Sequence, residues 1–176
     1  MIRQLAATDS KAYYELRLRG LTLHPESFGT GAEDWSKATD GQVQDLLQKS
    51  NRDDFVLGYF EKDVLVGVIG LKREKKHSVA HKGTVWGFFV FPEYRRRGSG
   101  VLLLKALIEK ASVHEELKFL RAVVTVTDMN VAHIFTSCGF AQYGLESHGI
   151  KQADHFYDQQ DGFIVRGVSC NCGQVR

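Results

Sequence analysis

The sequence has little proline, little cysteine and no long hydrophobic run. Only 2 of its 176 residues are proline, which argues against a disordered or linker-rich chain. Its 3 cysteines, Cys138, Cys170 and Cys172, do not make the framework of a disulfide-rich secreted protein. No apolar run approaches the ~20 residues of a membrane span, and the first residues do not resemble a signal peptide. We therefore expect a reduced, cytoplasmic protein that does not bind membranes.

Charge of one sign is also lacking. The chain has 23 basic and 21 acidic residues, so a net charge of +2 gives it no general attraction for nucleic acid. The charged stretch 72–77 has no interleaved aromatic residues, which favours an exposed turn over a nucleic-acid site. Cys170 and Cys172 have no further cysteine nearby to complete a metal site. We expect them in a C-terminal tail, 167–176, that follows a single domain, 1–166.

The hydrophobic pattern predicts one mixed α/β domain. Strands are expected at 2–5, 55–60, 64–71, 84–91, 119–127, 140–146 and 155–165. Helices are expected from Thr8-Asp9 to the break at His24, over 32–49, over 101–114, and from Asp128 or Asn130 to Gly139. The apolar, aromatic strand 84–91 is predicted to be buried on both sides. The inner face of the helix over 32–49 is predicted to comprise Trp35, Val43, Leu46 and Leu47.

An arginine- and glycine-rich segment, 95–100, predicts a site for an anion. Pro92 ends the buried strand before it, and an apolar helix follows it. Gly98 and Gly100 allow a tight turn with no Cβ to block a ligand. The start of a helix offers unpaired N–H groups and the positive end of the helix dipole, so pyrophosphate is the natural occupant. Three consecutive arginines at a positive helix end repel one another unless an anion neutralises them.

Two motifs resemble those of the GCN5-related N-acetyltransferases, the GNAT family. The segment 90–100 resembles the family's Arg/Gln-x-x-Gly-x-Gly/Ala motif, with a strand before it and a helix after it. The segment 128–140, which ends in Gly139-Phe140, is similar to the second motif, an Asn-led helix closed by Gly-Phe. The N-terminal segment 16–28 is similar to the opening of many bacterial members.

The resemblance implies a mostly antiparallel mixed sheet of about six to seven strands with about four flanking helices. The sheet would be splayed between its fourth and fifth strands, 84–91 and 119–127, and acetyl-CoA would lie in the gap. Backbone groups of 88–90 would pair with the pantetheine arm, and the amides of 95–100 would hold the pyrophosphate. The residues that the resemblance assigns to cofactor binding are Phe88, Phe89, Val90, Arg95, Arg96, Arg97, Gly98, Ser99, Gly100, Asp128, Asn130 and Phe135.

The implied reaction is direct acetyl transfer, in a ternary complex, to a primary amine of a small molecule, an amino acid or a peptide. No metal and no nucleic acid take part, and the protein would be a monomer or a homodimer. Acceptor specificity would lie in a helical lid over 21–49 and in a late loop over 147–154. A non-catalytic acyl-CoA sensor of the same fold is the alternative.

The chain departs from the family's pattern at the residues that would carry catalysis. Phe135 replaces a tyrosine that serves as proton donor, and Cys138 is more simply a core residue on the same apolar stripe. Arg96 replaces a glycine and Ser99 an apolar residue. Either Asp128 or Asn130 takes the position of the leading asparagine. Strand 84–91 has no glutamate to act as base, so we expect a base acting through water, with Glu26, His81, Tyr143 and His155 as the polar candidates.

Overall fold

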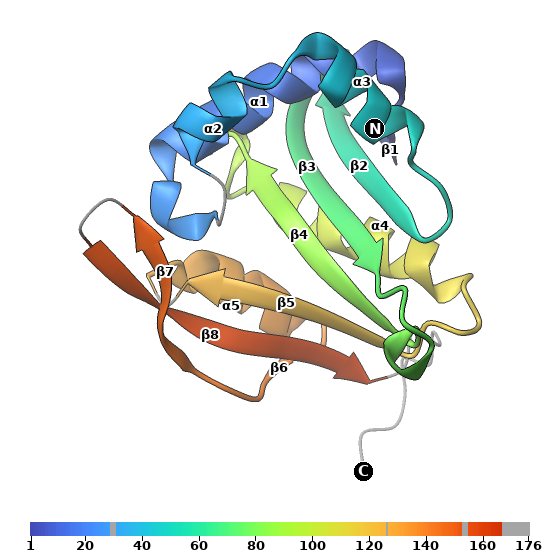
Figure 1. Cartoon of the computed structure of the whole chain (residues 1–176), viewed down its shortest axis with the longest axis vertical. Helices are drawn as coiled ribbons and strands as arrows, with labels where there is room; N and C mark the ends of the chain where they lie inside the picture. The colour runs from blue at the N-terminus through green and yellow to red at the C-terminus, as the bar shows by residue number, and fades with distance from the viewer. Residues whose placement is uncertain (29–30, 126, 153–154, 167–176) are drawn as a thin grey trace.

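The computed structural model describes residues 1–28, 31–125, 127–152 and 155–166. Its eight strands form one sheet in the order β1-β2-β3-β4-β5-β8-β6, with β7 also paired to β8 (Figure 1). They are β1 (Ile2–Gln4), β2 (Asp54–Glu61), β3 (Val64–Arg73), β4 (Lys82–Val90), β5 (Phe119–Thr125), β6 (Ala141–Gln142), β7 (Glu146–Gln152) and β8 (His155–Arg166). All pairs are antiparallel except β4 with β5, which confirms the predicted mixed sheet.

The sheet opens between β4 and β5. Their parallel pairing covers only 82–85 with 119–122, and beyond it the two strands diverge (Figure 1). On its other side β4 carries a bulge, because the register with β3 shifts between Val68 and Gly70. Gly87 lies in this bulge with a φ of 63°, a backbone angle that favours glycine. The predicted splay between the fourth and fifth strands is therefore present, with a bulge beside it.

Burial of β4 on both sides was a wrong prediction. Trp86, Gly87 and Phe88 are only half-buried, whereas Phe89 and Val90 are buried. The physical reason is the splay, since this half of β4 has no neighbouring strand on the β5 side. Its apolar side chains line an opening instead of a continuous sheet interior.

Helices cover both faces of the sheet. They are α1 (Ser10–Leu23), α2 (Ala32–Ser36), α3 (Asp40–Gln48), α4 (Ser99–Ser112) and α5 (Met129–Ser137). Residues of α1 and α3 share one apolar core with β2, β3 and β4, and residues of α4 and α5 form the other core with the opposite sheet face. Among the described residues, no helix is long and apolar enough to cross a membrane.

The single helix expected over 32–49 is in fact two helices. Thr39 begins α3 with a capping box, in which its side chain accepts from Gln42 N–H and the Gln42 side chain accepts from Thr39 N–H. Val43 and Leu47 are buried as predicted, but Leu46 is 38% exposed, so its expected place on the inner face is wrong. The predicted loop over 147–154 is also wrong in part, because β7 occupies most of it.

An ion-pair network holds the paired end of the sheet. Arg73 contacts Asp53 (3.2 Å) and Glu116 (2.5 Å), and His114 Nε2 lies 2.5 Å from the same Asp53 oxygen. Burial alone would raise the pKa of Asp53, but its bonds to His114 and Arg73 lower that pKa below the usual range. Arg73, in the basic stretch 72–77, is therefore neutralised by partners within the protein.

Packing at the bulge makes Gly70 sensitive to substitution. A Cβ at Gly70 would lie 2.7 Å from Trp86 Cζ2, closer than two carbons can approach. We predict that Gly70→Ala lowers the free energy of unfolding by about 1–3 kcal/mol, measured by urea denaturation. The control is Gly41→Ala in α3, where a Cβ meets nothing within 4 Å and stability should stay equal or rise by up to about 1 kcal/mol. Equal losses in both variants would contradict the packing argument.

Candidate active site

The arginine-rich turn joins β4 to α4. A short 3-10 turn, η4 (Pro92–Tyr94), ends the strand, and α4 begins at Ser99. Between them Arg96 and Gly98 adopt left-handed backbone angles, with φ of 59° and 77°. Glycine takes such an angle freely, whereas a residue with a Cβ is strained by it. Arg96, which stands where the family pattern has glycine, is therefore the strained residue of the turn.

The start of α4 presents unpaired backbone donors. Its first hydrogen bond runs from Leu102 N–H to Gly98 O at 3.0 Å, so the N–H groups of 99–101 have no partner within the helix. The helix dipole adds partial positive charge at the same point. The predicted strand–turn–helix unit is present, and it offers an anion the positive end of a helix.

Ser99 and Gly100 have packing roles that the sequence analysis did not predict. The Ser99 hydroxyl is buried and donates to Tyr94 O at 2.9 Å, so it secures the turn. A Cβ on Gly100 would lie 2.9 Å from Ile134 Cδ1 and 3.1 Å from Phe88 Cζ. Gly100 therefore allows α4 to approach α5 and β4 closely.

The three arginines of the turn differ in their surroundings. Arg95 Nε donates to Val90 O at 2.7 Å, and an Arg95 Nη lies 3.2 Å from His24 Nε2, so this side chain ties the end of β4 to the end of α1. Arg97 lies against the ring of Tyr94, 5.8 Å from its centroid, and is not among the residues that line the cavity described next. Arg95 and Arg96 both line that cavity.

A cavity of about 440 Å³ lies between the end of β4, the turn, the start of α4 and α5. Of the residues predicted to bind the cofactor, it brings together Phe88, Phe89, Val90, Arg95, Arg96, Gly98, Ser99, Gly100, Asp128 and Asn130. Arg97 and Phe135 are not among its lining residues. Lining residues that the sequence analysis did not assign are His24, Ser27, Phe28, Val101, Val131, His133 and Ile134.

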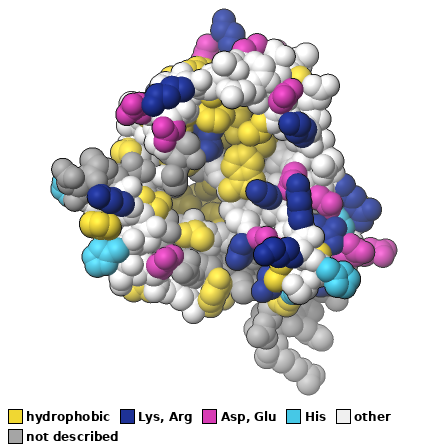
Figure 2. All heavy atoms as spheres, viewed as in Figure 1, with side chains coloured by type: hydrophobic (Ala, Val, Ile, Leu, Met, Phe, Trp, Pro, Cys, Tyr) yellow, Lys and Arg dark blue, Asp and Glu magenta, His cyan; other side chains and the backbone are white. Residues whose placement is uncertain are grey.

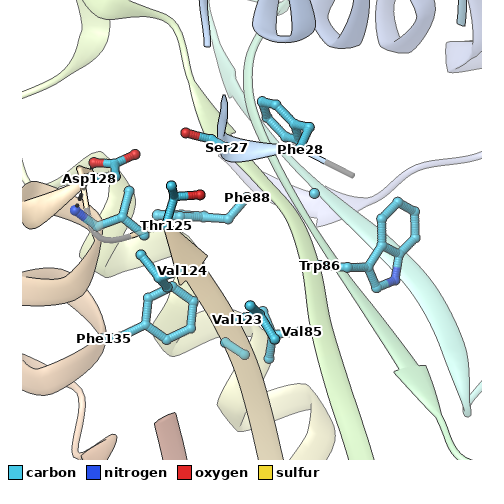
Figure 3. A pocket seen from close by; sticks show the side chains of 13 residues that line it. Ser27, Phe28, Val85, Trp86, Phe88, Val123, Val124, Thr125, Asp128 and Phe135 are labelled. Atoms are coloured by element: carbon cyan, nitrogen blue, oxygen red, sulfur yellow. Dashed lines mark hydrogen bonds between the residues drawn. The ribbon is translucent and has the colours of Figure 1, made fainter. Parts of the chain in front are cut away.

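A second, smaller cavity of about 60 Å³ lies where β4 and β5 diverge (Figure 3). Phe135 lines it with an almost fully buried ring, 2% exposed, that packs edge-on against Phe88 and Phe140. The two cavities adjoin, because both are lined by Ser27, Phe28, Phe88, Asp128 and Val131. Figure 2 shows this face of the molecule, hollowed between the upper helices and the β5–β8 arm, with hydrophobic side chains around the hollow.

Asp128 and Asn130 have different positions in the site. Asp128 caps α5 by accepting from Val131 N–H at 3.3 Å, and it lines both cavities. Asn130 lines only the larger cavity. Among the described residues, Asp128 is the one ionisable side chain that lines the cavity at the divergence of β4 and β5.

The four polar residues considered as a base do not line either cavity. His81 packs against Phe119 at the paired end of the strands, and Tyr143 is 60% exposed. His155 lies at the exposed start of β8. Glu26 lies nearest to the site, but its carboxylate is 3.4 Å from His24 Nδ1.

A hydrogen bond crosses the opening of the sheet. The Thr125 hydroxyl, at the end of β5, donates to Glu26 O at 2.7 Å. Glu26 belongs to the short turn η2 (Pro25–Ser27), which follows α1 and also lies beside β7. The segment that follows α1 therefore covers the divergence of β4 and β5, and Ser27 and Phe28 reach the cavity from it (Figure 3).

Other candidates from the sequence have simpler surroundings. Cys138 is half-buried and packs against the core of α4 and α5, as expected of a core residue. Within the described ranges, no group of three or more His, Cys, Asp or Glu is arranged to hold a metal ion. Cys170, Cys172 and the expected tail lie outside the described residues.

Solved structures share this fold. An acetyltransferase of the GNAT family from Streptococcus pneumoniae superposes with a TM-score of 0.83 at 21% identity, over 94% of this chain and 98% of that one. A candidate acetyltransferase from Salmonella typhimurium, solved with its cofactor acetyl-CoA, gives 0.82 at 17% identity over 98% and 96%. The ribosomal-protein-S18-alanine N-acetyltransferase of Escherichia coli gives 0.71 at 15% identity over 100% and 99%. No curated protein matches the sequence.

The family model for the acetyltransferase (GNAT) family matches residues 13–140. This match includes most of α1, the splayed strands β4 and β5, the turn and α5. The chain therefore belongs to the GNAT family of acetyltransferases, and the resemblance drawn from its two motifs is confirmed.

The left-handed angle of Arg96 leads to a stability prediction. Arg96→Gly should raise the free energy of unfolding by up to about 1 kcal/mol, because relief of the strained angle exceeds the entropic cost of glycine. Arg97→Gly removes the same charge at a position without a left-handed angle, and it should lower stability by about 0.5–1 kcal/mol. Urea denaturation of both variants tests this. Opposite signs are expected, and the same sign in both would refute the strain argument.

Proposed function

We propose that the protein transfers the acetyl group of acetyl-CoA to a primary amine, directly and in a ternary complex. The observation that supports this most is that the two cavities adjoin, one at the start of α4 and the other at the divergence of β4 and β5, and share lining residues. An elongated cofactor fits that path, with its phosphates at the helix start and its thioester at the divergence. We assign residues 1–166 to the catalytic domain, because β8 pairs along β5 up to Arg166.

The pyrophosphate would bind at the N–H groups of the turn and of the start of α4. Arg96 would add its charge there, since it lines the larger cavity, whereas Arg95 is already engaged with Val90 O and His24. Helix N–H groups have fixed directions, so they need no rearrangement to meet an anion. The affinity for phosphate would therefore come from the backbone first and from Arg96 second.

The pantetheine arm would pair with the open edge of β4. The residues 86–90 have no strand partner on the β5 side, so their backbone groups are available to an extended amide-bearing ligand. Asp128 and Asn130 face the same cavity from α5. A carboxylate only accepts hydrogen bonds, so Asp128 would bond an N–H of the arm, and the Asn130 amide can also donate to a carbonyl.

Transfer then requires a neutral amine at the smaller cavity. At pH 7 an alkyl amine of pKa ~10.4 is neutral in only about one molecule in two to three thousand. Among the described residues, Asp128 is the one ionisable side chain that lines this cavity, so it would accept the proton, directly or through water. The bulge at Gly87 frees backbone groups that can polarise the thioester carbonyl. The thiolate, of pKa ~8.5 by analogy with cysteine, can leave without a proton donor.

Cofactor selectivity tests the proposal. Acetyl-CoA should raise the thermal unfolding midpoint, by the equivalent of about 2.7 kcal/mol at 100 times its Kd. ADP carries the adenine and pyrophosphate without the pantetheine arm, so it should stabilise the protein less. Release of free thiol over a panel of primary amines then measures turnover. Equal stabilisation by both ligands would overturn the cofactor assignment, and stabilisation by acetyl-CoA without turnover of any amine would favour the sensor function.

Phe135→Tyr tests how the thiolate leaves. The new hydroxyl would lie at the wall of the smaller cavity, where it can protonate the leaving sulfur. A positioned general acid typically raises the rate by about 100-fold or more. We expect a smaller rise in kcat here, because the thiolate already leaves fairly easily without a proton donor. Phe140→Tyr is the control, since Phe140 packs on Phe135 but lines neither cavity. An unchanged or lower kcat in a folded Phe135→Tyr would show that the native enzyme does not lack an acid.

A further inference from the structure

Arg17 is a half-buried cation with no acidic partner. It belongs to α1, and it takes part in none of the ion pairs formed by the described residues. Its Nε is buried and has no hydrogen-bond partner. A buried charge is costly unless it is paired, so an arginine left in this state needs an explanation.

Aromatic rings enclose the Arg17 guanidinium. Its central carbon lies 4.8 Å from the ring centroid of Trp35, 5.7 Å from that of Trp86 and 5.9 Å from that of Phe28. Burial raises the pKa of Tyr13, one helical turn earlier, and the Arg17 guanidinium opposes that rise through its charge and through a hydrogen bond with the Tyr13 side chain. The rings stabilise the cation and fix its position, but none of them accepts its N–H groups as a carboxylate does.

The same surroundings join Arg17 to the smaller cavity. Phe28, Trp86 and Gly87 all line that cavity. Gly87 has no side chain, and a Cβ there would lie only 3.3 Å from an Arg17 Nη. Because Gly87 has no side chain, an Arg17 Nη lies close behind the wall that Gly87 gives to the smaller cavity, although Arg17 itself is not among the residues that line it.

We propose that Arg17 binds a carboxylate of the acceptor, so that the substrate class is an amine that also carries a carboxylate, such as an amino acid. This inference rests on the proposed acetyltransferase function and narrows its acceptor. A guanidinium binds a carboxylate through two parallel hydrogen bonds, which supply the missing partner and orient the amine. The smaller cavity, at about 60 Å³, holds the volume of roughly two water molecules, which suits the amino end of a compact acceptor.

The carboxylate is tested by comparing a pool of amino acids with the matching pool of amino-acid amides. Free-thiol release should give the amino acids a kcat/KM about 10- to 100-fold higher in the native protein, which is the range of one charge-assisted contact. The α-amino group of an amide has a pKa near ~8 and is the more neutral amine, so its intrinsic reactivity acts against this preference.

Arg17→Met should abolish the preference by raising the KM of the amino acids, while the KM of acetyl-CoA stays unchanged. Arg17→Lys keeps the charge but loses the paired donors, so it should retain part of the preference. This variant replaces Arg17→Met in the test if Arg17→Met does not fold. The matched control is Arg19→Met on the same helix, because Arg19 is 47% exposed and pairs with Glu93 at 2.8 Å. This control should keep the full preference.

The two proposals fail in different ways. Equal turnover of acids and amides by the native protein, or a preference that survives Arg17→Met, would overturn the carboxylate site and leave the acetyltransferase intact. If no amine is acetylated, thermal stabilisation by the amino-acid pool without acetyl-CoA tests the site directly. It should occur in the native protein and in Arg19→Met but not in Arg17→Met, and its absence in the native protein would refute the carboxylate site.

Discussion

The opening between β4 and β5 depends on one short run of pairing. The parallel strands are joined only over 82–85 and 119–122, and the ion-pair network around Arg73 and Asp53 holds that end of the sheet. After Val85, β4 has no neighbouring strand on the β5 side. The apolar residues that follow on β4 therefore line a cavity instead of the interior of the sheet. The pairing stops there, and this exposes the edge of β4 and the bulge at Gly87 to the cavities that α5 borders on the other side.

The anion end of the site is mainly a property of the backbone. The N–H groups at the start of α4 and the dipole behind them exist whichever side chains surround them. Of the three arginines, Arg95 joins β4 to α1 and also lines the larger cavity. Arg96 lines the same cavity at a left-handed backbone angle, and Arg97 lies against Tyr94. Three adjacent arginines of equal charge therefore have three different surroundings in the structure.

Local signals made the strand–turn–helix unit predictable. Pro92, the glycines and the apolar helix act over a few residues, and each has a direct effect on the backbone. The two helices at Thr39 carried a readable signal, the capping box Thr39-x-x-Gln42, that the long apolar pattern obscured. Gly87, a glycine inside an aromatic strand, was likewise a readable sign of the bulge.

Other features arise from contacts between distant segments, which no local pattern specifies. The half-buried state of Trp86 and Phe88 depends on a missing neighbour, and the count of strands rose because β7 pairs with β8 where a loop was expected. Ser27 and Phe28 reach the site only because the segment after α1 folds over the sheet. The surroundings of Arg17 combine two helices, a turn and a strand, so its lack of an acidic partner is visible only in three dimensions.

The hydrogen bond from Thr125 to Glu26 O bridges the open end of the splayed sheet. Within the described ranges, strand pairing joins the two arms at one end. At the other end this bond links β5 to η2, which also packs beside β7. A single hydrogen bond contributes only about 0.5–1.5 kcal/mol, roughly one to three times the thermal energy RT. Breaking this hydrogen bond therefore costs little free energy. The width of the opening therefore depends on the weak hydrogen bond between Thr125 and Glu26, while the β4–β5 pairing keeps the two strands aligned at the other end.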